Sequence, residues 1–181
     1  MDSSLILKTD RLILEPLSLK HATEKYVSWL NDHQVYKYLD TRGGQTIDSL
    51  KEFINHQINS KIYIWAIIDK SLNVHIGNIK IDPINDVHKY GEYGILIGDK
   101  DYWGKGFATE ASKEVLNYFF TNKNYLRKIN LGVVEKNIEA INLYKKLGFK
   151  QEGYLNRHLL YDGVELDVIR MAIFRDIFLS K

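Results

Sequence analysis

The chain contains no cysteine, only two prolines in 181 residues and no long apolar run. The lack of cysteine excludes disulfides, thiolate metal ligands and a cysteine acyl-enzyme. No apolar stretch approaches the roughly 18 residues that a membrane-spanning helix needs, so no membrane partner is expected. The residues before Leu5 lack a basic segment followed by an apolar core, and we therefore expect a cytoplasmic protein without a targeting segment.

An excess of charge of one sign is also missing. The net charge is only +2, which leaves little of the long-range attraction that nucleic-acid binders depend on, and no nucleic-acid partner is expected. The six histidines are scattered without an H-E-x-x-H pattern or an i,i+4 pair, so no metal is expected. Length and a hydrophobic content of 45% predict one domain over residues 1–181.

Hydrophobic patterns in the first half of the chain predict strands alternating with helices. We expect a strand over residues 5–17, broken by a polar turn, then a helix over about 19–31 capped by Ser18 and another helix starting at Thr46. Further strands are expected at 62–69, 74–82 and 90–98, the first two forming a hairpin.

The second half predicts a different order, in which helices separate the strands. We expect a helix over about 106–122, a strand over 127–135, a helix over 138–147, and two strands, 149–157 and 165–174, around Asp162-Gly163. The whole pattern indicates an α+β fold around a mixed sheet.

Two glycines, Gly104 and Gly106, lie between a predicted strand and a predicted helix. Glycines expose backbone N–H groups, and the positive end of the helix dipole points the same way, which favours phosphate. The spacing excludes a dinucleotide fingerprint, which needs a third glycine at Thr109, and it also excludes a P-loop. Taken alone, the pair fits an ordinary tight turn equally well.

A second segment favours the phosphate interpretation. The loop from Trp103 to Ala108 is followed by the pattern Asn137-x-x-Ala140-x-x-Leu143-Tyr144-x-x-x-Gly148-Phe149. With Thr9-Asp10-Arg11-Leu12 and Ile76-Gly77-Asn78-Ile79, these segments resemble the GNAT superfamily of acyl-CoA N-acyltransferases, in the branch of the ribosomal-protein N-acetyltransferases (RimJ/RimL type). The resemblance covers nearly the whole chain. Trp103 departs from the Gln or Arg that begins the superfamily's pyrophosphate motif, so its side chain receives no phosphate contact.

The resemblance implies a GNAT fold, with a mixed, mostly antiparallel sheet of about seven strands, about four helices, and strands four and five splayed apart. It implies acetyl-CoA as co-substrate, with the pantetheine arm along the fourth strand and the backbone of that strand as oxyanion donor. The residues it assigns to the coenzyme are Ile95, Leu96, Ile97, Gly104, Lys105, Gly106, Phe107, Ala108, Thr109, Asn137 and Tyr144.

Direct acetyl transfer to an amine needs a base and an acid. An alkyl amine has a pKa of about 10.4 and must lose a proton before it attacks a thioester. The resemblance favours Glu92 as that base, with Glu135 and Asp40 in reserve, although a solvated edge-strand charge is the other interpretation of Glu92. Tyr144 takes the position of the acid that protonates the leaving thiolate.

The acceptor is expected to be a small-molecule or peptide amine. We expect its pocket to involve Tyr36, Tyr38, Asp40, Arg42 and Arg157, whereas the helical spacing of Tyr26 and Trp29 fits the core as well as a pocket. Three acceptors stay open: a protein N-terminus, a nucleotide-linked amino sugar of surface-polysaccharide biosynthesis, and a polyamine or aminoglycoside. Binding of a polyamine usually requires a strongly acidic pocket, whereas this loop combines Arg42 with Asp40.

Two further points stay open. A non-catalytic acyl-CoA sensor that keeps the fold is the alternative of another class. Homodimers are common in the resembled family, so a second copy of the chain is among the expected partners.

Overall fold

The computed structural model describes residues 5–122 and 125–180. Residues 1–4, on which the expectation of no targeting segment partly rests, lie outside that description. By its contacts the chain divides into two compact units, which are described separately. The first unit is Met1–Asp82 with Gly94–Glu114, and the second is Pro83–Tyr93 with Val115–Lys181. The assignment of residues 1–181 to one domain stays a prediction.

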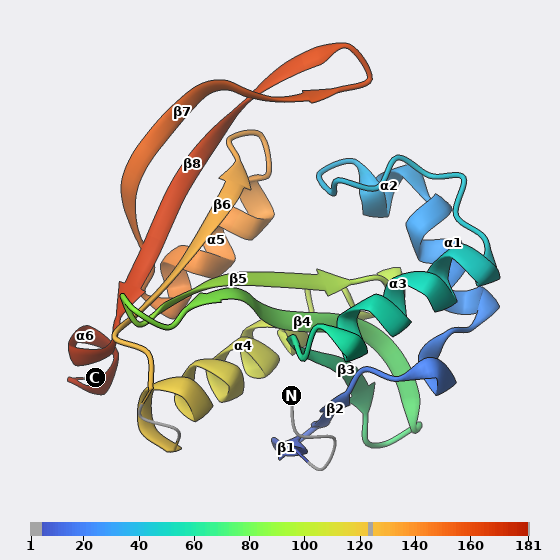
Figure 1. Ribbon diagram of the computed structural model, residues 1–181, viewed down its shortest axis with the longest axis horizontal. Coiled ribbons are helices and arrows are strands. Elements are labelled where there is room, and N and C mark those ends of the chain that lie inside the picture. The colour runs from blue at the N-terminus through green and yellow to red at the C-terminus, as the bar shows by residue number, and fades with distance from the viewer. Residues whose placement is uncertain (1–4, 123–124, 181) are drawn as a thin grey trace. The chain divides into compact units, whose positions relative to one another are not determined.

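The chain forms an eight-stranded sheet in the order β1-β2-β3-β4-β5-β6-β8-β7, one strand more than expected (Figure 1). The extra strand arises because the polar turn splits the expected strand over residues 5–17 into β1 (Leu7–Lys8) and β2 (Leu12–Pro16). The other strands are β3 (Tyr63–Asp69), β4 (Val74–Asn85), β5 (Tyr90–Ile97), β6 (Lys128–Val134), β7 (Lys150–Tyr161) and β8 (Val164–Phe174).

Strand pairing confirms a mixed sheet with a splayed pair. β1 to β4 pair in antiparallel fashion, as do β6 with β8 and β8 with β7. β5 and β6 are parallel, and their register covers only Tyr90–Glu92 and Lys128–Asn130. β5 and β6 are the strands expected as the fourth and fifth, and a parallel contact this short lets them splay apart as predicted.

In the first unit, helices pack on the sheet through an apolar cluster. α1 (Glu24–Asn31) and α3 (Ile47–Asn59) contribute the buried side chains of Tyr26, Trp29 and Ile54 to a core shared with β3. Tyr26 and Trp29 are therefore core residues, one of the two interpretations that their spacing allowed. Shorter helices in this unit are η1 (Leu19–His21), α2 (His33–Tyr36) and η2 (Lys100–Tyr102).

Capping explains where the helices begin. Thr46 caps α3, as predicted, by accepting a hydrogen bond from the backbone N–H of Ser49. The helix expected over 19–31 is interrupted, because Thr23 accepts a hydrogen bond from the N–H of Tyr26 and starts α1 afresh after η1. Ser18 caps only the short η1.

The second unit holds the long β7–β8 hairpin (Figure 1). Asp162 and Gly163 have φ values of 52° and 79° and form its turn, which is tighter than expected because both strands extend closer to it. The helices completing the chain are α4 (Phe107–Asn117, which begins in the first unit), the π-helix η3 (Tyr118–Asn122), α5 (Ile138–Leu147) and α6 (Arg175–Leu179). Over residues 5–122 and 125–180, every helix is too short or too polar to cross a bilayer.

Candidate active site

The glycine loop of the first unit has the backbone form of an anion site. Gly104 and Gly106 adopt φ values of 71° and 83°, which residues with a Cβ rarely reach. α4 begins at Phe107, and the N–H of Glu110 donates to the carbonyl of Gly106 at 3.1 Å. The backbone N–H groups of residues 107–109 thus belong to the first turn, where N–H groups lack intrahelical acceptors and favour an anion.

Trp103 anchors the entry to this loop. Its indole Nε1 donates a 2.7 Å hydrogen bond to the carbonyl oxygen of Ile97, at the end of β5. The indole therefore fixes the loop to the strand. That Trp103, which replaces the motif's Gln or Arg, makes no phosphate contact stays a prediction.

Arg11 supplies a cation beside the loop. Its Nη1 donates to the carbonyl of Lys105 at 3.1 Å, and its guanidinium lies 4.1 Å from the centre of the Phe107 ring. Its Nε contacts Glu110 Oε2 at 2.7 Å, and its backbone N–H donates to Glu110 Oε1 at 2.9 Å. Arg11 thus connects the start of the chain to both the loop and the first turn of α4.

Sequence reasoning did not identify this cluster. Thr9 also donates to Glu110. Partial burial raises the pKa of Glu110, but the hydrogen bonds from Thr9 and Arg11 lower it by more, so the pKa lies below its ordinary value. The carboxylate stays ionised and binds Arg11. Arg11 and Glu110 are far apart in the chain. The family resemblance of Thr9-Asp10-Arg11-Leu12 pointed to this segment, but nothing in it indicated Glu110 as the partner.

In the second unit, α5 presents Tyr144 as predicted. Asn137 caps the helix by accepting from the N–H of Ala140 at 3.3 Å, and Gly148 ends it at a φ of 102°. The ring of Tyr144 lies edge-on to that of Tyr93 on β5, with 5.9 Å between centroids. Burial raises the pKa of Tyr144 to about 12, so the phenol is protonated at neutral pH.

Glu92 lies on the opposite face of β5 from Tyr93, because successive side chains of a strand alternate. Its two carboxylate oxygens accept from Nη1 and Nη2 of Arg170, each at 2.7 Å, and Asn130 Nδ2 also donates to it. The hydrogen bonds to Glu92 raise the pKa of Arg170. Gly132 makes room for this arginine, since a Cβ there would lie 2.9 Å from Arg170 Nη1.

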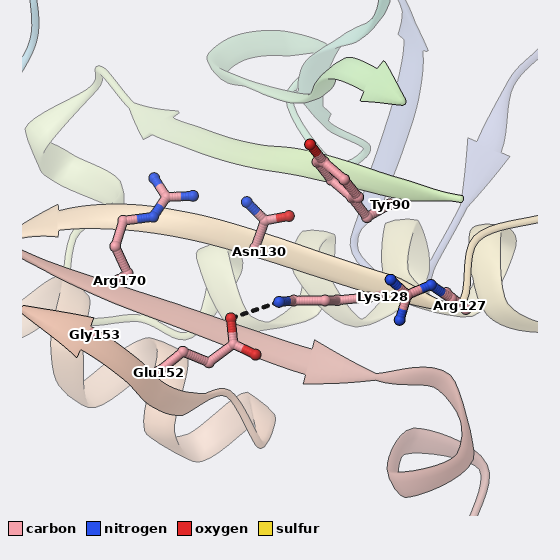
Figure 2. Close-up of a pocket in the computed structure, with 7 residues that line it drawn as sticks. All are labelled: Tyr90, Arg127, Lys128, Asn130, Glu152, Gly153 and Arg170. Carbon is pink, nitrogen blue, oxygen red and sulfur yellow. Dashed lines mark hydrogen bonds and ion pairs between the residues drawn. The ribbon is translucent and has the colours of Figure 1, made fainter. Parts of the chain in front are cut away.

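A polar depression of about 400 Å³ lies within the second unit, and Arg170 and Asn130, which both donate to Glu92, line it. Figure 2 shows the side chains of Arg170, Asn130 and Lys128 along neighbouring strands, with Lys128 bound to Glu152 at 2.6 Å. Tyr90 and Arg127 complete its charged and aromatic lining. The depression is therefore lined mostly by charged side chains, including one complete ion pair, Lys128 with Glu152.

The predicted acceptor residues fall into two groups. In the first unit, Arg42 donates to the carbonyls of Tyr36 and Leu39 at 3.4 and 3.2 Å, and its guanidinium lies 5.2 Å from the centre of the Tyr36 ring. Arg42 and Tyr36 thus stabilise the loop that also carries Tyr38 and Asp40. Arg157 belongs to the second unit, where its backbone N–H donates to Asp167 and its guanidinium is mostly exposed.

The first unit also contains an apolar pocket of about 310 Å³ that sequence reasoning only partly located. It is lined by residues of α1, α3, β3, β4 and the 39–45 loop, and Gly94, Ile95 and Leu96 on β5 form another wall. Tyr26 lines it as well as packing in the core. Phe53, Asn78 and Lys80 were missed, because no motif marks a wall that converges from separate elements.

Comparison with known proteins identifies the family. Residues 11–150 match the acetyltransferase (GNAT) domain. The chain belongs to the GNAT acetyltransferase family. This GNAT protein is 30% identical over 151 residues to a spermidine N(1)-acetyltransferase of Vibrio cholerae, a match covering 83% of this chain and 86% of the relative. It is 40% identical over 105 residues to a spermidine N(1)-acetyltransferase of Escherichia coli K12, covering 58% of this chain and 55% of that one.

Solved structures agree. The crystal structure of spermidine N-acetyltransferase from Vibrio cholerae in complex with CoA and spermine superposes with a TM-score of 0.84 at 29% identity, covering 94% of this chain and 99% of that one. A GNAT acetyltransferase from Bacillus anthracis gives the same TM-score at 24% identity, which supports the fold alone. The chain is an acetyl-CoA-dependent N-acetyltransferase of the GNAT type. In the described part of the chain, no three His, Asp or Glu residues cluster as a metal site would require.

The Arg11 cluster generates a prediction. Arg11→Met removes a guanidinium that holds the loop and the first turn of α4, and we expect the Kd for coenzyme A to rise about tenfold, since hydrogen bonds to charged groups contribute about 1.5–3 kcal/mol. Isothermal titration calorimetry measures this. The control is Lys51→Met, which loses an exposed ion pair with Asp48 on α3. Equal Kd values for the two variants would contradict a role for Arg11 at the loop.

Proposed function

We propose that the protein transfers the acetyl group of acetyl-CoA directly to the primary amine of a small molecule, with Tyr144 as general acid and Glu92 as general base. The observation that carries this proposal is the buried, protonated Tyr144, held on α5 against the β5 strand that also bears Glu92. Because the chain has no cysteine, transfer proceeds without a cysteine acyl-enzyme.

The proposed coenzyme site is supported by backbone geometry. The N–H groups from Gly104 to Thr109 receive the pyrophosphate, since the positive φ values and the start of α4 align them outward. The backbone of Ile95–Ile97 receives the pantetheine arm and the thioester oxygen. Asn137 is assigned both the cap of α5 and a contact to the pantetheine.

Tyr144 serves as the acid when the carbon–sulfur bond breaks. A leaving thiolate needs a proton, and a phenol that is protonated at working pH can supply it. Tyr144 is also the residue that separates an enzyme from a non-catalytic acyl-CoA sensor, because a sensor needs the fold but not the phenol.

Glu92 serves as the base through the one acceptor position that its neighbours leave open. A carboxylate has about four lone-pair positions, and Arg170 and Asn130 occupy three of them. The remaining position, on Oε1, receives the amine or a water that relays its proton. Arg170 engages both oxygens of Glu92, so Glu135 at the end of β6 is kept as the second candidate.

The acceptor is proposed to be a small amine, because the relatives with named substrates are spermidine acetyltransferases. A protein N-terminus, as in the RimJ/RimL branch, and a nucleotide-linked amino sugar remain second candidates that rest on sequence motifs. Assembly into a homodimer likewise stays a prediction.

Replacing Tyr144 tests the acid. Tyr144→Phe should lower kcat about a hundredfold, the usual range for loss of a general acid, while changing the Kd for acetyl-CoA little. Since burial raises the pKa of Tyr144 to about 12, wild-type kcat should not decline through loss of its proton between about pH 8 and about pH 10. Thiol release measures both, with Tyr63→Phe on β3 as control. Equal kcat values for Tyr144→Phe and wild type would remove Tyr144 from the mechanism.

Replacing Glu92 tests the base. Glu92→Gln keeps the shape and the hydrogen bond to Arg170 but cannot take a proton, so kcat/KM should fall about a hundredfold and its low-pH limb should flatten. Glu152→Gln, which removes the acid of the neighbouring Lys128 pair, is the matched control and should retain that limb. If the low-pH limb of kcat/KM is unchanged in Glu92→Gln, the proton of the amine is taken by Glu135 or by a water chain instead.

A further inference from the structure

Two polar atoms at the wall of the apolar pocket lack hydrogen-bond partners. Asn78 Nδ2 and Thr41 Oγ1 are both buried without a partner, and both residues line the pocket. Asn78 is only 6% exposed. Buried polar atoms are normally paired, so an orphaned amide at the edge of a cavity points to a partner supplied by a ligand.

His75 fixes which end of the Asn78 amide is unpaired. His75 Nε2 lies 2.9 Å from the carbonyl oxygen of Gly77 and 3.2 Å from Asn78 Oδ1. Because a carbonyl only accepts, Nε2 must carry the hydrogen, and the Asn78 atom facing it must be the oxygen. The orphan is therefore the NH₂ group, a donor. Burial, followed by the charge of His21, lowers the pKa of His75 to about 4, which keeps this ring neutral and the arrangement unchanged at neutral pH.

The charges around the pocket disfavour a polycation. No carboxylate is among the described residues that line it, and its one ionised lining side chain is that of Lys80. Lys80 packs its methylenes over Gly94 and places its Nζ 3.7 Å from Asp82 Oδ2, outside the pocket lining. A polyamine offers only donors and positive charge, so it would leave the Asn78 donor unpaired and find no carboxylate among the described residues that line the pocket.

We infer that this pocket selects an amine whose body is uncharged and largely apolar and carries an oxygen acceptor for Asn78, in preference to a polyamine. The inference rests on the proposed function, because it takes the wall formed by Gly94, Ile95 and Leu96 as the place where the amine meets the thioester. In the step itself the amine nitrogen forms the new bond to the acetyl carbon and the carbon–sulfur bond breaks. The proton of the amine goes to the base, and the thiolate takes a proton from the acid.

Three amines test this selectivity: 4-aminotetrahydropyran, which carries a ring oxygen, cyclohexylamine, which has a methylene in its place, and spermidine. Binding is measured by titrating each amine into the complex of the protein with coenzyme A and following it by NMR. Turnover with acetyl-CoA is measured by thiol release. We expect the ether amine to bind about tenfold tighter than cyclohexylamine, because the latter leaves Asn78 unpaired, and both to bind tighter than spermidine.

Two variants assign the effect to Asn78. Asn78→Leu should remove the preference for the ring oxygen, and Asn78→Asp should reverse the order so that spermidine binds tighter than the ether amine, a gain that a folding defect would not produce. Lys51→Met, on α3 and outside the pocket lining, is the control that should keep the wild-type order. Tighter binding of spermidine to the wild type, no binding of any amine, or an oxygen preference that survives in Asn78→Leu would overturn the inference. If the amines bind with the expected order of affinities but none is acetylated, the proposed function is overturned and the selectivity stays in place.

Discussion

The structure depends on how the chain turns from η2 into α4 through two residues with positive φ. Gly104 and Gly106 permit a turn that a side chain would strain, and the Arg11–Glu110 pair holds the first turn of the helix behind it. Glu110 places a negative charge near the helix start, where it would compete with a phosphate, and Arg11 neutralises that charge. With that charge neutralised, the backbone N–H groups of the loop can attract an anion without a basic residue at the first position of the motif.

The strand β5 combines several of the proposed roles in one short segment. Within the second unit, its alternation sends Glu92 to the polar face with Arg170 and sends Tyr93 to the face occupied by Tyr144. Within the first unit, its continuation, Gly94 to Leu96, forms a wall of the apolar pocket. A parallel pairing to β6 that covers only three residues of each strand leaves the rest of its backbone available to a coenzyme.

The sequence was sufficient for features that depend on local chemistry. The cap of α5 at Asn137, its end at Gly148 and the hairpin turn at Asp162-Gly163 follow from residue preferences that neighbours in the chain do not alter. The break at Thr23 was missed because two hydroxyl residues, Ser18 and Thr23, competed to start the same helix. Arg11 with Glu110, and Asn78 with His75, could not be predicted, since each depends on which elements the fold brings together.

The same distinction explains the candidate acceptor residues. Arg42 and Asp40 stay predicted substrate residues, and the structure adds that Arg42 also donates to the carbonyls of Tyr36 and Leu39. Charged residues in a loop are conspicuous in a sequence, whereas an unpaired amide in an apolar wall is visible only in three dimensions. The relatives with named substrates are spermidine acetyltransferases, and this chain keeps their fold while no carboxylate is among the described residues that line its apolar pocket.

Hydrogen exchange of the backbone amides with and without acetyl-CoA tests the central claim most directly. The account predicts that bound acetyl-CoA slows exchange at residues 104–109, which donate to its pyrophosphate, and along Ile95–Ile97, which holds its arm. Saturating binding that leaves exchange at residues 104–109 unchanged would contradict it.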